Sequence, residues 1–475
     1  MTWRRQLSRQ YGSRDLKCFV GILILLVVTI VGLMLRSQTL ETGDDVGFMF
    51  EESTTHRVNV RHRHVDSTVS SPGFKDDSRS QSSQPKTSGG AGGFPRPFPS
   101  STSDLKDFKS PYIRRSSDPY RDLKLTREDK REVTSNKVIT WYAVAATQLP
   151  EDLFDDDVFD DCPAHRCRFV KPEMLKREDK DKVVDAIIFP GVAGRDKEPP
   201  SRTHPDQTRQ AIDQHDLPPW QSEKVFIYYD MEAPMHPAKS FGSQAWNSIF
   251  NWTWSYRRDA DIWQPAGFLQ RVDKVKPSTS FKDIVKAKNK HKVVAWFANT
   301  CNVPSKRDQY VRELQKHIQV DMFGQCGNLT CPKGFACLET LSSKYFFYLS
   351  FEDALCKDYV TDKFFDMFLE DIHLVPVVLG GADYESFFPQ GTYIDASWFS
   401  SPKDLAEFLK FLMEDKKTYT EFLWRKSHFV YTGSDTNSAL CQLCQQLHSL
   451  KSSRRTYPDF QQWYRTDQCK APRPV

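Results

Sequence analysis

The chain has 475 residues, of which 66 are Lys or Arg and 62 are Asp or Glu, so its net charge is only +4. Because the basic residues are scattered and form no stripe, this balance argues against a nucleic-acid-binding protein. The length leaves room for two ordinary domains.

One apolar run, residues 18–35, stands close to the N-terminus. As a helix it would be roughly 27 Å long, enough for the hydrocarbon core of a thin bilayer. Basic residues precede the run and acidic residues follow it, which predicts a cytoplasmic tail at 1–17, a signal-anchor at 18–35 and a translocated remainder. A cleaved signal peptide is the alternative, but no small-residue cleavage pattern follows the run.

Residues 36–136 are rich in Ser, Arg, Asp, Pro and Gly and have no apolar periodicity. Such a segment buries too little apolar surface to offset the entropy of ordering it, so we expect a disordered stem.

After Cys18, every cysteine lies between Cys162 and Cys469, and these ten residues form an even set. That pattern favours disulfides in an oxidising compartment, with the pairing left open. The alternative is a zinc site built from Cys441 and Cys444 with a second pair such as Cys326 and Cys331. Two sequons predict N-glycosylation at Asn251 and Asn328.

Two blocks of apolar segments predict an α/β fold. In the first, short strands are expected at 138–144, 184–190 and 224–230. In the second, strands at 291–299, 320–324, 344–351 and 374–381 alternate with helices at 305–318, 361–371 and 401–415. Alternation of this kind predicts parallel sheets covered by helices, here two Rossmann-like domains (137–280 and 281–430) facing a cleft, followed by a Cys-containing tail at 431–475.

The stretch 345–365 carries the most chemistry. A strand delivers Glu352 and Asp353 to its carboxyl end, Tyr359 follows in a turn, and Asp362 and Lys363 open a helix. A helix start beside a lysine suits phosphate, while carboxylates can bind sugar hydroxyls, so the layout suits a nucleotide sugar. From the pattern alone, ordinary helix capping with surface charge remains the alternative.

This stretch resembles the donor motif of the α1,3-fucosyltransferases of glycosyltransferase family 10, whose usual form is FYLxFENSxxxDYxTEK. The segments PVVLG, YESFFP, SPKDLAEFL and FLWRK follow in the family's order, between residues 376 and 426. Upstream, YDMEAP (229–234) and FNWTWSYRRDADIWQPAG (250–267) resemble the family's two other signatures. The resemblance covers about 138–426, and the chain is similar to the invertebrate members of the family.

The resemblance implies a GT-B fold, with acceptor recognition mainly in the first domain and GDP-fucose in the second. It implies inverting transfer of fucose to a GlcNAc residue of a glycoprotein or glycolipid glycan. It also implies a single-pass type II protein of the Golgi membrane with a lumenal catalytic domain. No obligatory cofactor is expected, although Mn²⁺ could stimulate the reaction.

Several site residues are implied by position. Glu232 stands where the family has its general base, and an inverting transfer needs one carboxylate to deprotonate the attacking hydroxyl. Arg307 matches an arginine that neutralises the departing diphosphate, a task that Lys363 is expected to share. The remaining donor-binding residues are expected to be Glu352, Asp353, Tyr359 and Asp362.

Two residues depart from the family's form. Asp353 replaces an Asn and adds a negative charge near an anionic donor, which Arg307 or Lys363 would have to compensate. Asp362 replaces a Glu and shortens the reach of the carboxylate by one methylene.

A further motif of uncertain role comprises Tyr256, Arg257, Asp259 and Asp261. An Asp-x-Asp pair holds a divalent metal in other glycosyltransferases. Because this pair lies within a fucosyltransferase-like segment, we interpret it as structural and predict no metal ligand.

Two other functions stay open. One is a metal-dependent GT-A transferase using Asp259 and Asp261, which loss of activity in EDTA would reveal. The other is an inactive glycan-binding relative, which would bind GDP without transferring fucose. The acceptor itself, whether core GlcNAc or a Lewis-type or LacdiNAc-type terminus, is not encoded in a readable motif.

Overall fold

A computed structural model describes residues 105, 108–114, 135–142, 149–175, 184–191, 224–235, 247–272, 280–332, 334–434, 436–449 and 455–474. The predicted cytoplasmic tail, the predicted signal-anchor at 18–35 and most of the predicted stem lie outside these residues. The described residues form two fully parallel sheets and a third, small mixed sheet.

The first sheet has six parallel strands in the order β3-β2-β4-β5-β6-β7. The strands expected near 138, 184 and 224 are its β2, β4 and β5, and all six residues of β5 are buried. The bounds are β2 Lys137–Trp141, β3 Cys167–Phe169, β4 Ala186–Pro190, β5 Val225–Asp230, β6 Trp252–Ser255 and β7 Ile262–Trp263.

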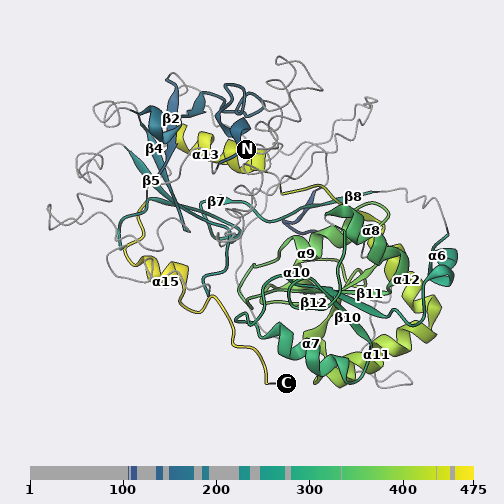
Figure 1. The fold of residues 1–475 in the computed structure, drawn as a ribbon. Helices are drawn as coiled ribbons and strands as arrows, with labels where there is room; N and C mark the ends of the chain where they lie inside the picture. The colour runs from purple at the N-terminus through teal and green to yellow at the C-terminus, as the bar shows by residue number, and fades with distance from the viewer. Residues whose placement is uncertain are drawn as a thin grey trace, which may run out of the picture. The chain divides into compact units, whose positions relative to one another are not determined.

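The second sheet has five parallel strands in the order β10-β9-β11-β12-β13. Helices surround it, as the alternating pattern predicts (Figure 1). The strands are β9 Val294–Phe297, β10 Val320–Phe323, β11 Phe347–Phe351, β12 Val375–Leu379 and β13 Ile394–Asp395. The helices are α6 Phe281–Ala287, α7 Arg307–Gln315, α8 Phe335–Lys344, α9 Asp362–Phe365, α10 Tyr384–Phe387, α11 Pro402–Glu414 and α12 Lys416–Lys426.

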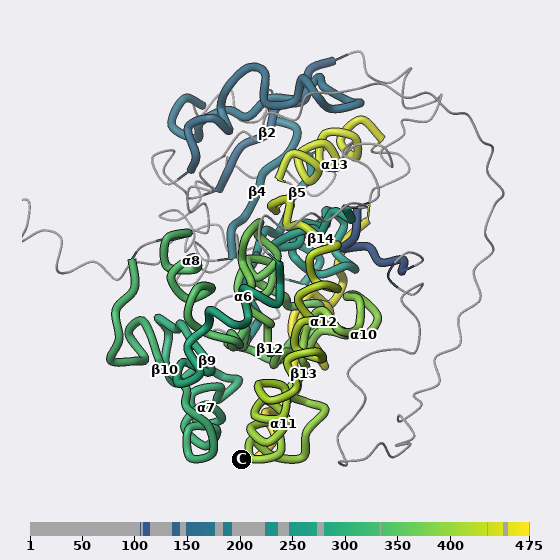
Figure 2. The backbone as a smooth tube through the Cα atoms, turned by 90° about the vertical axis from the view of Figure 1, so that its right-hand side faces the viewer, coloured from purple at the N-terminus to yellow at the C-terminus, as the bar shows by residue number. Residues whose placement is uncertain are grey.

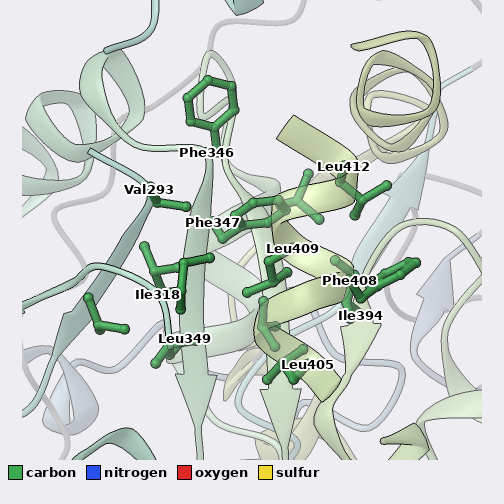
Figure 3. Close-up of a cluster of buried hydrophobic side chains, with 14 of the residues drawn as sticks. Val293, Ile318, Phe346, Phe347, Leu349, Ile394, Leu405, Phe408, Leu409 and Leu412 are labelled. Carbon is green, nitrogen blue, oxygen red and sulfur yellow. The ribbon is translucent and has the colours of Figure 1, made fainter. Parts of the chain in front are cut away.

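Helix α11 shows how sequence and core meet in this domain. The Ser401 hydroxyl accepts a hydrogen bond from the Asp404 amide, and Pro402 occupies the first helical position, so the helix begins where the sequence predicts. Its leucines, among them Leu405 and Leu409, point at the sheet and pack near Phe347 (Figure 3). Burial of each such side chain contributes about 1.5–3 kcal/mol to the free energy of folding.

Part of the segment predicted to be a disordered stem is ordered. Strand β1 Ile113–Arg114 pairs with β8 Leu269–Arg271, which also pairs with β14 Phe429–Tyr431. Tyr112 is 1 % exposed because its ring packs among Trp263, Phe387 and Phe388. At 108–114 the disorder prediction is therefore wrong.

The C-terminal part returns to the first sheet. Helix α13 Thr436–His448 contacts β2 and β7, and a short helix, α15 Phe460–Tyr464, follows. In Figure 2, α13 is the yellow helix in the upper part of the view, where β2 also lies. Disulfides Cys162–Cys441 and Cys167–Cys444 fasten α13. Helices α13 and α15, from the predicted C-terminal tail, thus pack on the first sheet. Short 3₁₀ helices complete the described elements at Glu151–Phe154, Pro172–Met174, Asp366–Phe368 and Ala396–Trp398.

The predicted disulfides are confirmed, and the zinc alternative is wrong. The remaining pairs are Cys301–Cys326, Cys331–Cys337 and Cys356–Cys469. Within the described part of the chain, one group of side chains, Cys167, Cys444 and His448, has metal-ligand spacing, but its two sulfurs are bonded to each other.

The prediction of a single-pass type II Golgi membrane protein requires a correction. Throughout the described ranges, no helix combines the length and the apolar character needed to cross a bilayer. Helices α11 and α13 have 13 residues each, or about 20 Å, against a hydrocarbon core of about 30 Å.

We predict that the two disulfides of α13 stabilise the fold more than the short Cys331–Cys337 loop does. They join residues 279 and 277 positions apart, against 6 for the short loop. Loop-closure entropy then gives a loss on the order of 5 kcal/mol for C441A/C444A and about 2 kcal/mol for C331A/C337A. Denaturant unfolding measures both, and equal losses would contradict the entropic argument.

Candidate active site

Glu232 lies just beyond the carboxyl end of β5, and the neighbouring Asp230 fixes its backbone. The Glu232 amide donates to Asp230 Oδ1 at 2.9 Å. Asp230 is itself buried, and its Oδ2 accepts hydrogen bonds from Tyr228 (2.7 Å) and Tyr464 (3.1 Å). Glu232 is partly exposed, so solvent can reach it while Asp230 fixes its backbone.

Glu352, predicted to bind the donor, is fully buried behind β11. Its two oxygens accept hydrogen bonds from the amide and the hydroxyl of Thr361, both at 2.8 Å. Burial raises the pKa of Glu352 to about 7, against the opposing effects of Lys363 and the Thr361 amide. Glu352 therefore holds the turn before α9, and its burial leaves no face for a ligand.

Lys363 is the partly exposed cation of the donor motif. Its Nζ donates to the Thr361 hydroxyl at 3.1 Å and lies 3.8 Å from the exposed Asp362 carboxylate. Burial lowers the pKa of Lys363, but the charges of Glu352, Asp362 and Asp353 outweigh burial and raise it above its ordinary value. The ammonium is therefore charged, and it compensates the extra negative charge of Asp353.

Arg307 opens α7 but is only 2 % exposed. Its guanidinium donates to the carbonyl oxygens of Phe351 (2.7 Å) and Thr300 (3.2 Å), while its buried Nε has no hydrogen-bond partner among the described residues. The side chain thus joins the ends of β9 and β11. A direct grip on a diphosphate, as predicted for Arg307, would require it to move.

Tyr359 brings the two predicted motifs into contact. Its hydroxyl donates to Glu232 Oε2 at 3.3 Å, and its ring packs edge-on against Tyr256 with the centroids 4.9 Å apart. Burial and then the charges of Asp353, Glu232 and Glu352 raise the pKa of Tyr359 well above its ordinary value. The hydroxyl therefore stays protonated and acts as a donor.

The Asp-x-Asp pair is committed to protein partners. Asp259 accepts two hydrogen bonds from Arg257, at 2.9 and 2.6 Å, and lies 3.8 Å from Lys357 Nζ. Asp261 accepts hydrogen bonds from Thr253 and Tyr457 and pairs with Arg455. The two carboxylates face different cations, which fits the structural interpretation.

A small pocket beside Glu232 contains residues that the sequence did not point to. Trp463 and Tyr464 reach it from the C-terminal segment, more than 200 positions away along the chain. Neither Arg307 nor Lys363 lines this pocket. The full lining consists of Tyr228, Asp230, Glu232, Pro234, Ser255, Tyr256, Arg257, Trp463 and Tyr464.

The two predicted glycosylation sites differ. Asn328 is exposed, as an acceptor must be. Asn251 is 8 % exposed, its Oδ1 accepts from the Phe226 amide, and its Nδ2, where a glycan would attach, donates to the Arg455 carbonyl. The folded geometry argues against a glycan on Asn251.

Comparison with known proteins gives the family. Residues 134–267 match the model "Fucosyltransferase, N-terminal", and residues 287–463 match "Glycosyltransferase family 10 (fucosyltransferase) C-term". Alpha-(1,3)-fucosyltransferase C of Drosophila melanogaster is 31 % identical over 344 residues, which cover 69 % of this chain and 74 % of that protein. The chain belongs to glycosyltransferase family 10, the fucosyltransferases.

Two further similarities are more partial. Glycoprotein 3-alpha-L-fucosyltransferase A of Drosophila melanogaster is 39 % identical over 254 residues, 52 % of this chain and 48 % of that protein. A crystal structure of an α1,3-fucosyltransferase aligns with a TM-score of 0.42 at 14 % identity, covering 66 % of this chain and 90 % of that chain.

The burial of Glu352 makes stability depend on pH. Its folded pKa of about 7 lies above the ordinary value of 4.5, so the folded state holds a proton that the unfolded chain releases. Its contribution is full below pH 4.5 and is lost as the pH rises to about 7. We expect Glu352→Gln to flatten the decline of Tm between pH 5 and 7.5 in scanning calorimetry. An unchanged pH profile would refute this origin.

Proposed function

We propose that this chain is an inverting α1,3-fucosyltransferase of GT-B architecture that moves fucose from GDP-fucose to a GlcNAc hydroxyl of a glycan. Family membership supports the transfer of fucose. The observation that carries the mechanism is the hydrogen bond from Tyr359, in the donor motif, to Glu232, in the segment that resembles the base motif.

In the proposed reaction Glu232 is the general base. The acceptor hydroxyl attacks the anomeric carbon of fucose, its proton passes to the Glu232 carboxylate, and the bond from that carbon to the phosphate oxygen breaks on the opposite side. GDP departs with the bonding electrons. Tyr359 donates to Oε2 of Glu232, so it helps to fix the orientation of the carboxylate that accepts the proton.

Lys363 would stabilise the charge that develops on the leaving diphosphate. It is protonated, it retains 23 % of its side-chain exposure, and it lies in the motif that Tyr359 connects to the base. Arg307 holds the ends of β9 and β11 together through its hydrogen bonds to the carbonyls of Phe351 and Thr300. In the proposal its positive charge also favours binding of the anionic donor.

The two other candidate functions gain less support. A metal-dependent reaction would need Asp259 and Asp261 to leave their partners Arg257 and Arg455. We therefore propose that transfer requires no divalent metal and persists in EDTA. An inactive glycan-binding relative would have no need for a partly exposed carboxylate held at both its backbone and its side chain.

Glu232→Gln tests the base. The amide keeps the shape of the side chain but cannot accept a proton, so we expect kcat to fall about 10²- to 10⁴-fold while GDP affinity stays unchanged. The measurements are radiolabelled fucose transfer and titration calorimetry with GDP. Glu407→Gln, on the exposed face of α11, is the matched control and should be fully active. An active Glu232→Gln enzyme would remove the base assignment.

Lys363→Ala tests the phosphate contact. Loss of a charge-assisted hydrogen bond costs about 1.5–3 kcal/mol, so the Kd for GDP should rise roughly 10- to 100-fold. Lys363→Arg should recover part of the affinity, whereas Lys410→Ala, an exposed lysine of α11, should leave it unaltered. Wild-type affinity in Lys363→Ala would exclude Lys363 from the donor site.

A further inference from the structure

We propose that residues 463–470 of the C-terminal segment form part of the active site, and that Tyr464 positions the base Glu232 through Asp230. The inference rests on the proposed function, because it assigns a role toward the base of that reaction. In this proposal Tyr464 and Asp230 are positioning residues, because they act through Glu232.

Asp230 is the centre of this arrangement. One of its oxygens holds the Glu232 amide, and the other receives the hydroxyls of Tyr228 and Tyr464. The site is built closely around the carboxylate, because a Cβ on Gly191 would come within 2.3 Å of Asp230 Oδ2. Because the Asp230 side chain has so little space to move, its hydrogen bonds with Tyr228 and Tyr464 fix the position of the Glu232 backbone.

Tyr464 is well suited to hold Asp230. It is 5 % exposed, and its ring stacks on Phe460 (5.6 Å, 10°) and meets Tyr228 edge-on at 5.3 Å. Burial and the neighbouring Asp230 charge raise the pKa of Tyr464 above its ordinary value. The hydroxyl therefore remains a donor throughout the working pH range.

The same segment also fastens the donor side. Cys469 is bonded to Cys356, three residues before Tyr359. Around this disulfide the Lys357 amide donates to the Gln468 carbonyl (2.7 Å), and the Lys470 amide donates to the Leu355 carbonyl (2.8 Å). One strap of chain thus anchors both the loop that carries Glu232 and the loop that carries its partner Tyr359.

The physical consequence concerns kcat. A misplacement of about 1 Å in a catalytic group can cost roughly 100-fold in rate. Removal of one of the two tyrosine hydroxyls on Asp230 loosens the carboxylate without exposing it, so we expect a smaller loss, about 3- to 10-fold. Each KM should change little, because in the proposal Tyr464 acts through Asp230 on the position of Glu232.

Tyr464→Phe is the test, and Tyr457→Phe is its matched control. Tyr457 precedes residues 463–470 in the chain and also donates its hydroxyl to a carboxylate, at 2.6 Å, but that carboxylate belongs to Asp261. The assay uses the purified full chain with GDP-fucose and a GlcNAc-terminated oligosaccharide. It measures kcat, KM for each substrate, GDP affinity and Tm.

The proposal expects both variants to lose similar Tm, while only Tyr464→Phe loses kcat, with each KM within about twofold of wild type. Asp230→Asn, which keeps the size of the side chain, should lower kcat further. Wild-type kcat in Tyr464→Phe, or an equal loss of kcat in both tyrosine variants, would overturn the positioning role. If Glu232→Gln stays active, the proposed base is wrong; if it is inactive while Tyr464→Phe is normal, only the positioning role is wrong.

Discussion

The hydrogen bond from Tyr359 to Glu232 is the interaction on which the functional reading of this fold depends. It joins a loop of the second parallel sheet to a loop of the first. Because Tyr359 is 2 % exposed and keeps its proton, it always presents a donor, and the carboxylate opposite it is held as an acceptor. The rest of the site can be understood as the means by which this contact is kept in place.

Several carboxylates around the site are committed to hydrogen bonds within the protein. Asp230, Glu352 and Asp261 are each enclosed, and each accepts at least two hydrogen bonds from hydroxyl or amide groups. Buried acids of this kind are costly unless they are fully paired, and when paired they fix the backbone around them. Among the acids of the predicted site, Glu232 and Asp353 are partly exposed and Asp362 is exposed.

The sequence was sufficient where local pattern decides the structure. The apolar strands and the Ser401–Pro402 helix start follow from periodicity and capping. The motifs that contain Glu232 and Tyr359 are also readable in the sequence, and the structure brings these two side chains into contact. The sequence failed where burial depends on distant partners. The order at Tyr112 comes from Trp263, Phe387 and Phe388, which no local pattern at 108–114 reveals. Likewise, the enclosure of Glu352 and Arg307 is a property of the strand ends around them and cannot be read from a motif.

The sequence does not reveal that the C-terminal segment reaches Asp230, and the reason is thermodynamic. A single hydrogen bond such as Tyr464 to Asp230 has a net value of about 1 kcal/mol, which cannot by itself offset the entropy of closing a loop of 234 positions. The Cys162–Cys441 and Cys356–Cys469 disulfides remove much of that entropy from the unfolded chain. The packing of Phe460 and Tyr464 against Phe189, Phe226 and Tyr228 also holds the segment on the first sheet. The cysteine pairing, which the sequence leaves open, and this long-range aromatic packing together bring the C-terminal segment to Asp230.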